Sequence, residues 1–463
     1  MFTNTDHQTV ARWTSPNAPA GLVGTPVKGM STQAGDGNEK KTAVLAEFEK
    51  LHPLKGVTME DDLEFKPIEV LTIKTDADME RAKKLAAEGR LVYGTRDAGP
   101  PTDHPHTSDC RHPFGYADFD VTRLDEAPTT KCPVRGCSVT LVKLLYGKQQ
   151  DRDGKYKERT KLWCPEHGIR LHSGTFVYWN GQGLEDEARL RNFIVRPDLV
   201  SAIALPKGMK AEAHRLGYEM SEDALSWNVF VSLAVAGKLR GAAQFLTGRS
   251  LRTEPHLYLW GRRIDDPDGR YSTYEPLRRA RAALEADIHT FVTEPDIMLV
   301  ADGEIVISIE AKFGSANPLA HDGEAKEGEK PTSRAGLLAR YLGERTSERT
   351  KHIVRPDHMG ASLHSQLFRN IVFASEMAGE VPWHVVNLVS STQRGTPNDV
   401  SHTFADPTND VRGYLHPDCQ HCFTYRTWEG LHAELIRNEP ALAGLDRYLR
   451  GKSAHYLPAF ELS

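Results

Sequence analysis

Residues 294–315 read EPDIMLVADGEIVISIEAKFGS and predict a β-hairpin. Two short apolar runs are joined by Asp302 and Gly303, a pair that accepts the positive φ of a tight turn. The second run alternates, because the isoleucines at 305, 307 and 309 face one way and the side chains between them face the other. We take this hairpin as the centre of the predicted α/β domain.

Three charged residues fall at one edge of the predicted hairpin. Glu310 and Lys312 lie two residues apart and share a face, and the hairpin register can bring Asp296 beside them. Two carboxylates and a lysine suit metal-assisted phosphodiester cleavage: the carboxylates hold hard cations, and the lysine orients water and offsets phosphate charge. An amphipathic hairpin with a surface salt bridge is the alternative interpretation.

The same residues carry a resemblance. Pro295-Asp296, thirteen intervening residues and then Glu310-Ala311-Lys312 resemble the signature of the PD-(D/E)xK (restriction endonuclease-like) phosphodiesterase superfamily. The resemblance covers about residues 215–392 and implies an αβββαβ core. It also implies Mg²⁺ or Mn²⁺ bound by Asp296, Glu310 and the main-chain carbonyl of Ala311.

A helix is predicted before the hairpin, capped by Ser221 and extending to about Phe245. Members of the superfamily often supply a further acidic metal ligand from this helix, and Glu222 occupies the matching place. Simple stabilisation of the helix N-terminus is the alternative role. Glu285 and Asp287 compete for the same metal, since they are nearer to the hairpin in sequence.

The remaining core elements follow from apolar periodicity. A strand is predicted at 256–262, a second helix at 363–378 and a last strand at 385–389. The resemblance implies that Gln366, on the second helix, lies near the metal. The insertion at 316–356 departs from the family pattern and is either a mobile clamp for a phosphate backbone or an inert loop.

A second metal site is predicted upstream of this core. Cys132 and Cys137, then Cys164 and His167, form two close pairs of the soft ligands that structural Zn²⁺ prefers, and His172 is an alternative fourth ligand. Strands are predicted at 139–146 and 161–163, around a polar loop at 147–159. The pattern resembles a zinc ribbon, which makes this a small zinc-ribbon-like β module.

Two further groups contain metal-ligand residue types. Cys419 and Cys422, near His402, are compatible with a second zinc site, a redox pair or a turn. A Pro-rich loop is favoured over a metal cluster for the other group, which consists of His104, His106, Cys110 and His112.

Length and composition limit the class of protein. The 463 residues suggest two or three domains: a flexible segment at 1–60, a region at 61–200 with the zinc module at about 128–180, and a nuclease-like domain at 201–463 with a C-terminal extension. The net charge of −5 means that any nucleic-acid surface must be local. Six cysteines, several beside histidines, indicate a reducing, cytoplasmic setting, and neither a membrane span nor a signal peptide is predicted.

These patterns and the resemblance predict a metal-dependent endodeoxyribonuclease, a hydrolase of phosphodiester bonds in DNA. A role in antiviral defence is what the resemblance implies. DNA repair, RNA cleavage, a transposition-type nuclease with a partner ATPase and a non-catalytic nucleic-acid binder are the alternatives. The chain has no P-loop pattern, so any ATP use would come from another chain. DNA is the expected partner, a homo-oligomer is compatible with the sequence, and no membrane is expected.

Overall fold

The computed structural model describes the backbone of the named strands and the side chains of the main structured parts of the chain. Side chains are described for residues 114, 116–120, 131–142, 162–171, 175–179, 188, 190–197, 199–200, 216–265, 271–288, 292–321, 333–391 and 406–463. The predicted flexible segment at 1–60, the histidine-rich loop at 104–112, the side chain of His172 and all of His402 lie outside these ranges.

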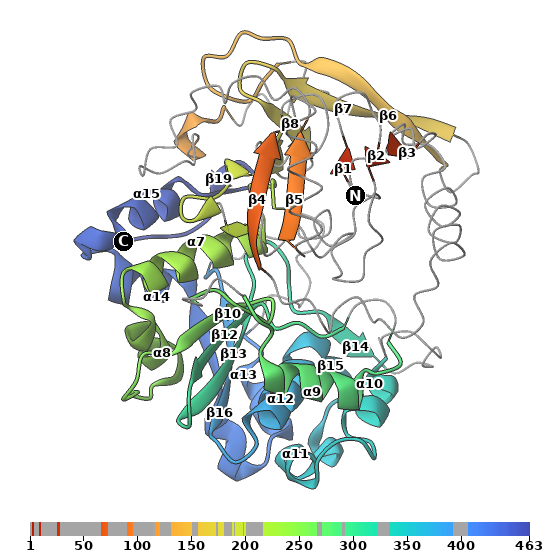
Figure 1. Ribbon diagram of the computed structural model, residues 1–463, viewed down its shortest axis with the longest axis vertical. Helices are drawn as coiled ribbons and strands as arrows, with labels where there is room; N and C mark the ends of the chain where they lie inside the picture. The colour runs from red at the N-terminus through yellow and green to blue at the C-terminus, as the bar shows by residue number, and fades with distance from the viewer. Residues whose placement is uncertain are drawn as a thin grey trace.

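The larger folded part of the molecule is formed by described residues from Glu222 to the C-terminus, and a mixed six-stranded sheet lies at its centre (Figure 1). Strands β10, β12 and β13 pair antiparallel, whereas β13, β16 and β17 pair parallel. The spatial order is β11 (Arg262–Arg263), β10 (His256–Leu259), β12 (Ile297–Ala301), β13 (Ile305–Ala311), β16 (Trp383–Val389) and β17 (Phe423–Thr427). The prediction of a mixed α/β architecture is confirmed.

The hairpin β12–β13 forms as the sequence predicts. Its register runs from Ala301 opposite Ile305 to Ile297 opposite Ile309, and Gly303 in the turn has φ 69°. Every residue of both strands is buried, because helices cover both faces of the sheet. The alternation of side chains therefore separates two apolar cores rather than a core from solvent.

The two cores lie on opposite faces of the sheet. The isoleucines of β13 pack with α7 (Glu222–Val235) and α8 (Leu239–Thr247), whereas Val306 packs with α9 (Glu275–Leu284) and α12 (Ser365–Ala378). The order α7, β10, β12, β13, α12, β16 matches the predicted order of core elements. That order places the ends of β12 and β13 beside the N-terminus of α7.

Three predicted elements are wrong in extent. The helix expected to reach Phe245 breaks at Gly237, where φ is 65°, because α7 ends and α8 begins there. The strand expected at 256–262 turns back at Trp260 and Gly261, which both have positive φ, so that β10 and β11 form a hairpin. The C-terminal residues 428–449, whose pattern predicts one terminal helix, are interrupted at Pro440, which lacks the amide hydrogen that a helix interior needs.

Shorter elements complete the larger part. The insertion at 316–356 contains the helix α10, and its strand β14 pairs antiparallel with β15, the strand that precedes α12. These elements are β14 (Leu319–His321), α10 (Arg334–Tyr341), α11 (Glu348–Ile353), β15 (Ser362–His364), α13 (Thr408–Tyr414), α14 (Trp428–Leu431), a π-helix (His432–Ile436), α15 (Ala443–Gly451), β18 (Ser453–Ala454) and β19 (Leu457–Pro458).

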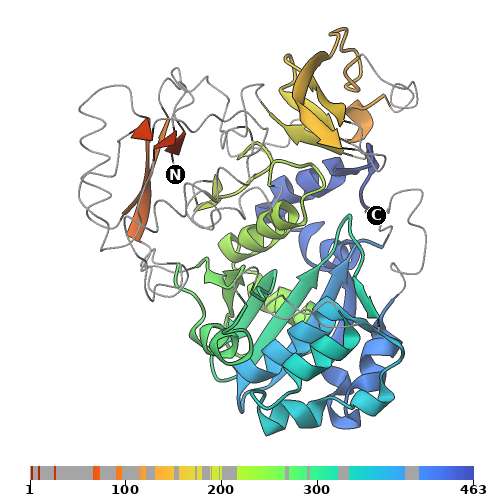
Figure 2. The ribbon, with the colours of Figure 1, turned by 90° about the vertical axis from the view of Figure 1, so that its right-hand side faces the viewer.

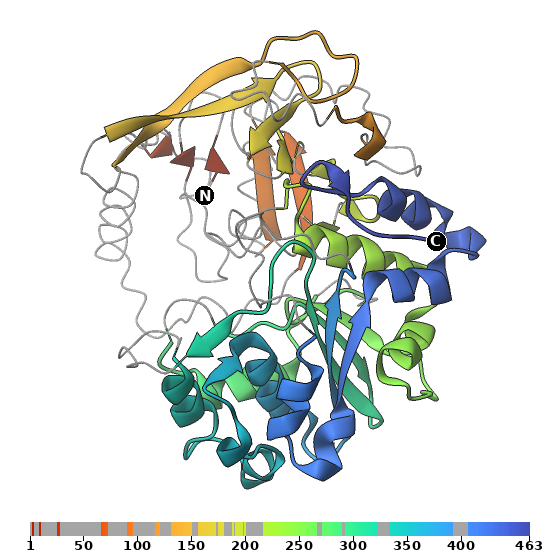
Figure 3. The ribbon, with the colours of Figure 1, turned by 180° about the vertical axis from the view of Figure 1, so that it is seen from behind.

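The smaller part is an antiparallel four-stranded sheet of β6 (Val142–Gln150), β7 (Tyr156–Cys164), β8 (Ile169–His172) and β9 (Thr175–Tyr178). Most of the loop predicted at 147–159 is strand, because β6 and β7 extend well beyond the predicted runs. Figures 2 and 3 show this sheet above the C-terminal helix α15. Nearer the N-terminus, the backbone forms β1 (Phe2–Thr3), β2 (Thr9–Val10), β3 (Pro26–Val27), β4 (Lys66–Thr72) and β5 (Arg90–Thr95).

Within the described ranges, none of the helices combines the length and the apolar character that crossing a bilayer requires.

Candidate active site and metal centre

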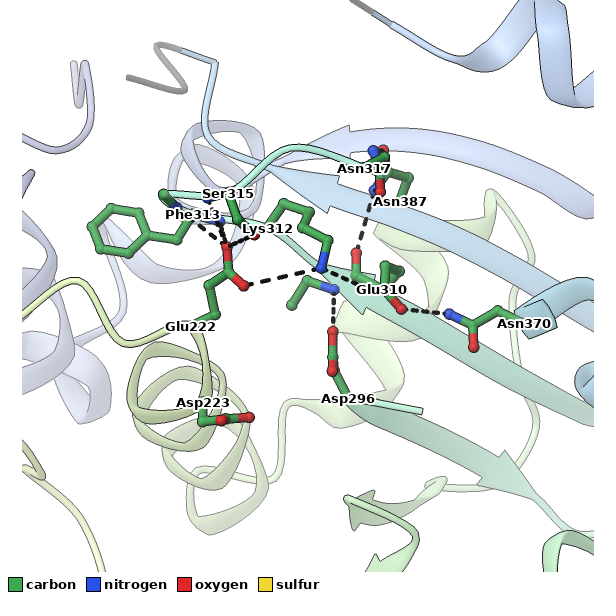
Figure 4. A network of polar contacts seen from close by, with 12 residues as sticks. Glu222, Asp223, Asp296, Glu310, Lys312, Phe313, Ser315, Asn317, Asn370 and Asn387 are labelled. Atoms are coloured by element: carbon green, nitrogen blue, oxygen red, sulfur yellow. Dashed lines mark hydrogen bonds and ion pairs between the residues drawn. The ribbon is translucent and has the colours of Figure 1, made fainter. Parts of the chain in front are cut away.

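The ends of β12 and β13 bring the predicted charged residues together (Figure 4). Ile297 pairs with Ile309, so Asp296 lies one step beyond the ladder and opposite Glu310. Lys312 follows β13 directly, and its Nζ lies 2.7 Å from Oε1 of Glu310. The predicted grouping of these three side chains is therefore present in the structure.

Helix α12 supports Glu310 through a residue that the sequence analysis missed. Asn370 donates from Nδ2 to Oε2 of Glu310 over 2.7 Å, and both side chains are buried. The predicted partner, Gln366, lies one turn earlier on the same helix and is half-buried. Gln366 and Asn370 are four residues apart and lie on one face of α12. The sequence therefore indicates which helix face lies toward Glu310, but not which of the two residues contacts it.

A pair of buried asparagines lies behind Glu310. Asn387 in β16 is oriented with its Nδ2 3.5 Å from the main-chain oxygen of Glu310, and Asn317 donates to Oδ1 of Asn387 over 2.9 Å. Both were missed, because their positions depend on the parallel pairing of β13 with β16. They fix the backbone that carries Glu310.

Asp296 keeps partial exposure to solvent and accepts a hydrogen bond from the Ala311 amide over 3.0 Å. Burial and the neighbouring Glu310 carboxylate raise the pKa of Asp296 well above its ordinary value. A cation bound here would replace a proton, so its affinity should increase with pH. The Ala311 carbonyl points to the same side as its amide, as in any strand, and is thus a third oxygen near this point.

Lys312 lies between the carboxylates. Burial alone would lower the pKa of Lys312, but the carboxylates of Glu310, Glu222 and Asp296 outweigh burial and raise it. The ammonium group is therefore charged at neutral pH, which suits it to neutralising phosphate charge and not to accepting a proton.

Glu222 has a different set of partners from the predicted one. Its Oε1 accepts from the amides of Phe313, Gly314 and Ser315 and from the Ser315 hydroxyl, over 2.7–3.3 Å. Its Oε2 lies 4.0 Å from Nζ of Lys312. Through these hydrogen bonds Glu222 fixes the loop at 313–315, which follows β13. Its role as a metal ligand stays a prediction. The adjacent Asp223 accepts a hydrogen bond from the indole of Trp260 over 2.6 Å.

The two competing acids are engaged elsewhere. Glu285 is buried and accepts hydrogen bonds from Thr293 and from the Tyr341 hydroxyl. Asp287 pairs with Arg340 over 2.7 Å. Glu285 thereby holds the chain that leads into β12, so it supports the site from a distance.

A separate cluster in the smaller sheet could hold a metal ion. The ligand atoms of Cys132, Cys137, Cys164 and His167 all lie within 4.8 Å of one another. The sulfur atoms of Cys137 and Cys164 are 3.9 Å apart, and His167 Nδ1 is 3.5 Å from the Cys164 sulfur and 3.7 Å from that of Cys132. Zinc–sulfur bonds of about 2.3 Å in a tetrahedron put ligand atoms roughly 3.5–3.8 Å apart, so the donor set is compatible with structural zinc.

The surroundings of this cluster also fit a cation. Burial raises the pKa of the Cys132 and Cys137 thiols, and the neighbouring Cys164 raises both further. Thiolates are therefore costly here unless a metal ion compensates them. Arg191 donates to the carbonyls of His167 and Gly168 and so fixes the turn that carries the histidine ligand.

Among the residues with described side chains, this is the one group of three or more histidine, cysteine or acidic ligand atoms gathered closely enough for a metal. The carboxylates beside Lys312 are not gathered to that degree, since the ammonium group lies among them. Cys419 and Cys422 lie in a 3₁₀-helix, and the Cys422 sulfur is 3.5 Å from His421 Nε2. A second zinc site involving His402 stays a prediction, because that residue is outside the described ranges.

Comparisons with protein families, curated proteins and solved structures found no match to this chain.

Asn370 provides a direct test of the site's support. Asn370→Ala removes the donor to Glu310. If Glu310 is a metal ligand of a nuclease, as the sequence predicts, this variant should weaken Mn²⁺ binding and DNA cleavage on the order of 10–100-fold, as loss of a partner behind a metal ligand does. Gln366→Ala, on the same helix face, is the matched control and should change either quantity by less than about threefold. Calorimetric titration with Mn²⁺ and a cleavage assay measure both. A larger loss in Gln366→Ala would restore the original assignment.

Proposed function

We propose that the chain is a divalent-metal-dependent nuclease that hydrolyses phosphodiester bonds in DNA. The proposal is supported above all by the convergence of Asp296, Glu310 and Lys312 at one sheet edge, with Asn370 fixing Glu310. The order of the core elements and the PD-(D/E)xK-like spacing agree with it. The restriction endonuclease-like fold and the role in defence rest on the resemblance.

Each group has a distinct proposed task. Asp296 and Glu310, with the Ala311 carbonyl, would hold Mg²⁺ or Mn²⁺, because hard cations prefer oxygen ligands. Such an ion supplies Lewis acidity and lowers the pKa of water. Lys312 neutralises charge that develops on the phosphate, since its ammonium group is held at a fixed place among the carboxylates. Glu222 keeps Lys312 and the following loop in that place.

We propose zinc as the ion of the second cluster and assign it a structural role. Four protein ligands complete a tetrahedron and leave no open position for a substrate or water. The ion would thus stabilise the small sheet, which has only a small apolar core of its own.

Cleavage assays test the proposed reaction. Purified protein is incubated with plasmid, linear duplex, single-stranded DNA and RNA, in Mg²⁺, Mn²⁺ or EDTA. Cleavage of DNA with either cation and none in EDTA is expected. DNA binding without cleavage under every condition would favour the rival function, a nucleic-acid-binding protein on a nuclease-like scaffold. Cleavage restricted to RNA would replace the substrate but keep the site.

Lys312→Met tests the lysine separately from the metal. The variant should lose cleavage on the order of 10²–10³-fold, because charge stabilisation near the reacting phosphate is removed. Mn²⁺ binding should be unchanged or tighter, since a competing cation leaves the carboxylates. Lys238→Met, which breaks the surface pair with Glu439, is the control and should cleave normally. Normal cleavage by Lys312→Met would exclude the proposed role.

A further inference from the structure

Residues 217–220, just before α7, connect the small four-stranded sheet to the start of that helix. The backbone of this segment pairs with β9 of the small sheet: the Tyr178 amide donates to the Gly217 carbonyl over 2.9 Å, and the Glu219 amide donates to the Phe176 carbonyl over 3.0 Å. Tyr218 forms an antiparallel bridge with Val177. Residues 217–220 therefore extend the small sheet, and α7 begins shortly after Glu219 with the cap Ser221.

The C-terminal tail fixes this segment through a buried ion pair. Lys452 Nζ lies 3.3 Å from Glu219 Oε2 and donates to Asn192 Oδ1 over 3.1 Å. The Ser453 amide donates to the other oxygen of Glu219 over 2.9 Å. Lys452, Glu219 and Asn192 are all fully buried, and Asn192 also donates to the carbonyls of Leu216 and Tyr218. The side-chain contacts thus bind the backbone of the segment as well as one another.

The tail continues into the small sheet itself. The Tyr456 hydroxyl donates to the Thr175 carbonyl over 2.6 Å, and its ring lies 5.4 Å from that of Phe119. Both rings belong to the apolar cluster that contains Cys132, Cys137 and Cys164. The tail from Lys452 to Tyr456 therefore joins α15 to the metal cluster's own core.

The other end of the segment, at Met220 and Glu222, contacts the loop at 313–315 beside Lys312. Met220 packs against Gly314, where an added Cβ would lie 2.4 Å from the methionine Cε. Glu222 Oε1 accepts hydrogen bonds from the amides of residues 313–315, and its Oε2 faces Lys312 (Figure 4). A shift of Met220 and Glu222 would move this loop and, with it, the lysine.

We propose that Lys452 is a positioning residue for the candidate active site, which acts through Glu219 on the segment that carries Met220 and Glu222. Buried carboxylate and ammonium groups tolerate little displacement, because each is costly to bury without the other. The pair therefore holds the start of α7 against both the small sheet and the loop at 313–315. The kinetic part of this inference rests on the proposed nuclease function, whereas its structural part does not.

Amide hydrogen exchange and cleavage kinetics test Lys452→Met, which keeps the length of the side chain and removes its charge. Exchange at the amides of 313–315 should accelerate about tenfold or more, while the amides of β16 keep their protection. The kcat for DNA cleavage should fall about tenfold to a hundredfold with little change in KM, as expected for a misplaced catalytic group. Lys238→Met breaks a surface ion pair with Glu439 and is the matched control, with normal exchange and kinetics expected.

Rescue separates positioning from general damage. In the double variant Glu219→Gln/Lys452→Met no charge is left unpaired, and the introduced carboxamide oxygen can still accept from the Ser453 amide, so exchange at 313–315 should return toward the wild-type rate. Glu219→Gln alone serves if Lys452→Met does not fold, and it should show the same local acceleration. Uniformly faster exchange across β16 and 313–315, or normal exchange at 313–315, would overturn the proposal. If local exchange changes as expected but no variant cleaves any nucleic acid, the positioning stands and the nuclease function fails.

Discussion

Asp296→Asn should abolish metal-dependent cleavage and, at the same time, stabilise the metal-free protein. Removing a cation ligand that stabilises the transition state by several kcal/mol should lower the cleavage rate on the order of 10³-fold or more. The stability gain has a different cause. The pKa of Asp296 is raised by burial and by Glu310, so its charged form is costly in the folded state. That cost is absent below the ordinary pKa of 3.8 and increases as the pH rises toward the folded-state value.

Thermal unfolding in EDTA and in Mn²⁺, at pH values from 5 to about 8, measures this balance. In EDTA the variant should unfold at a higher temperature than the wild type, with a difference that increases with pH. In Mn²⁺ the wild type should gain stability and the variant should not. Asp302→Asn, at the exposed turn of the same hairpin, is the control and should match the wild type. Metal-dependent cleavage by Asp296→Asn would falsify the assignment.

The hairpin was predictable because its determinants are local. Turn residues, the alternation of isoleucines and the spacing from Asp296 to Glu310 are all contained within one short stretch. Three element boundaries were wrong for local reasons as well: Gly237 and Gly261 adopt positive φ inside apolar runs, and Pro440 interrupts a helical pattern. Glycine and proline within a periodic run are the local signals that mark these interruptions.

The support of the site was not predictable, because it is tertiary. Asn370 reaches Glu310 only when α12 packs on β13, and the same helix face offers Gln366 as an equal candidate. Glu222 was correctly placed near the site, but its partners are three consecutive amides about ninety residues away. Backbone amides leave no trace in side-chain patterns, so the sequence suggested only a metal ion or the helix N-terminus as the partner of Glu222.

The cluster of Cys132, Cys137, Cys164 and His167 was predictable from spacing, whereas its connection to the rest of the chain was not. Two ligand pairs in turns indicate the cluster directly. Lys452 and Glu219 are separated by more than two hundred residues, and each alone has the character of an ordinary surface charge in the sequence. Their burial together joins the small sheet to the start of α7, across the predicted boundary at residue 200. The division of the chain into domains thus stays a prediction.

Cys164→Ser should release the proposed zinc ion and unfold the small sheet. The Cys164 sulfur lies 3.9 Å from that of Cys137 and 3.5 Å from His167 Nδ1, so its loss removes a central ligand. Zinc binding to such sites supplies about 10–16 kcal/mol in small zinc modules. Elemental analysis should show the loss of about one zinc ion per chain. Ser138→Ala changes an exposed residue beside Cys137 that is not a ligand, and it is the matched control, with zinc content and stability unchanged. A wild-type protein that binds no zinc when metal is supplied would exclude the site.

The same variant also measures how far the effect of zinc extends. If the small sheet unfolds, β9 no longer holds residues 217–220, and the contacts of Tyr456 with Thr175 and Phe119 are lost. Amide exchange should then accelerate at 313–315, beside Lys312, as well as in the small sheet, whereas the central strands β13 and β16 should keep their protection. Exchange that accelerates in the small sheet alone would show that the larger part folds independently, with Lys452 and Glu219 sufficient to hold the start of α7.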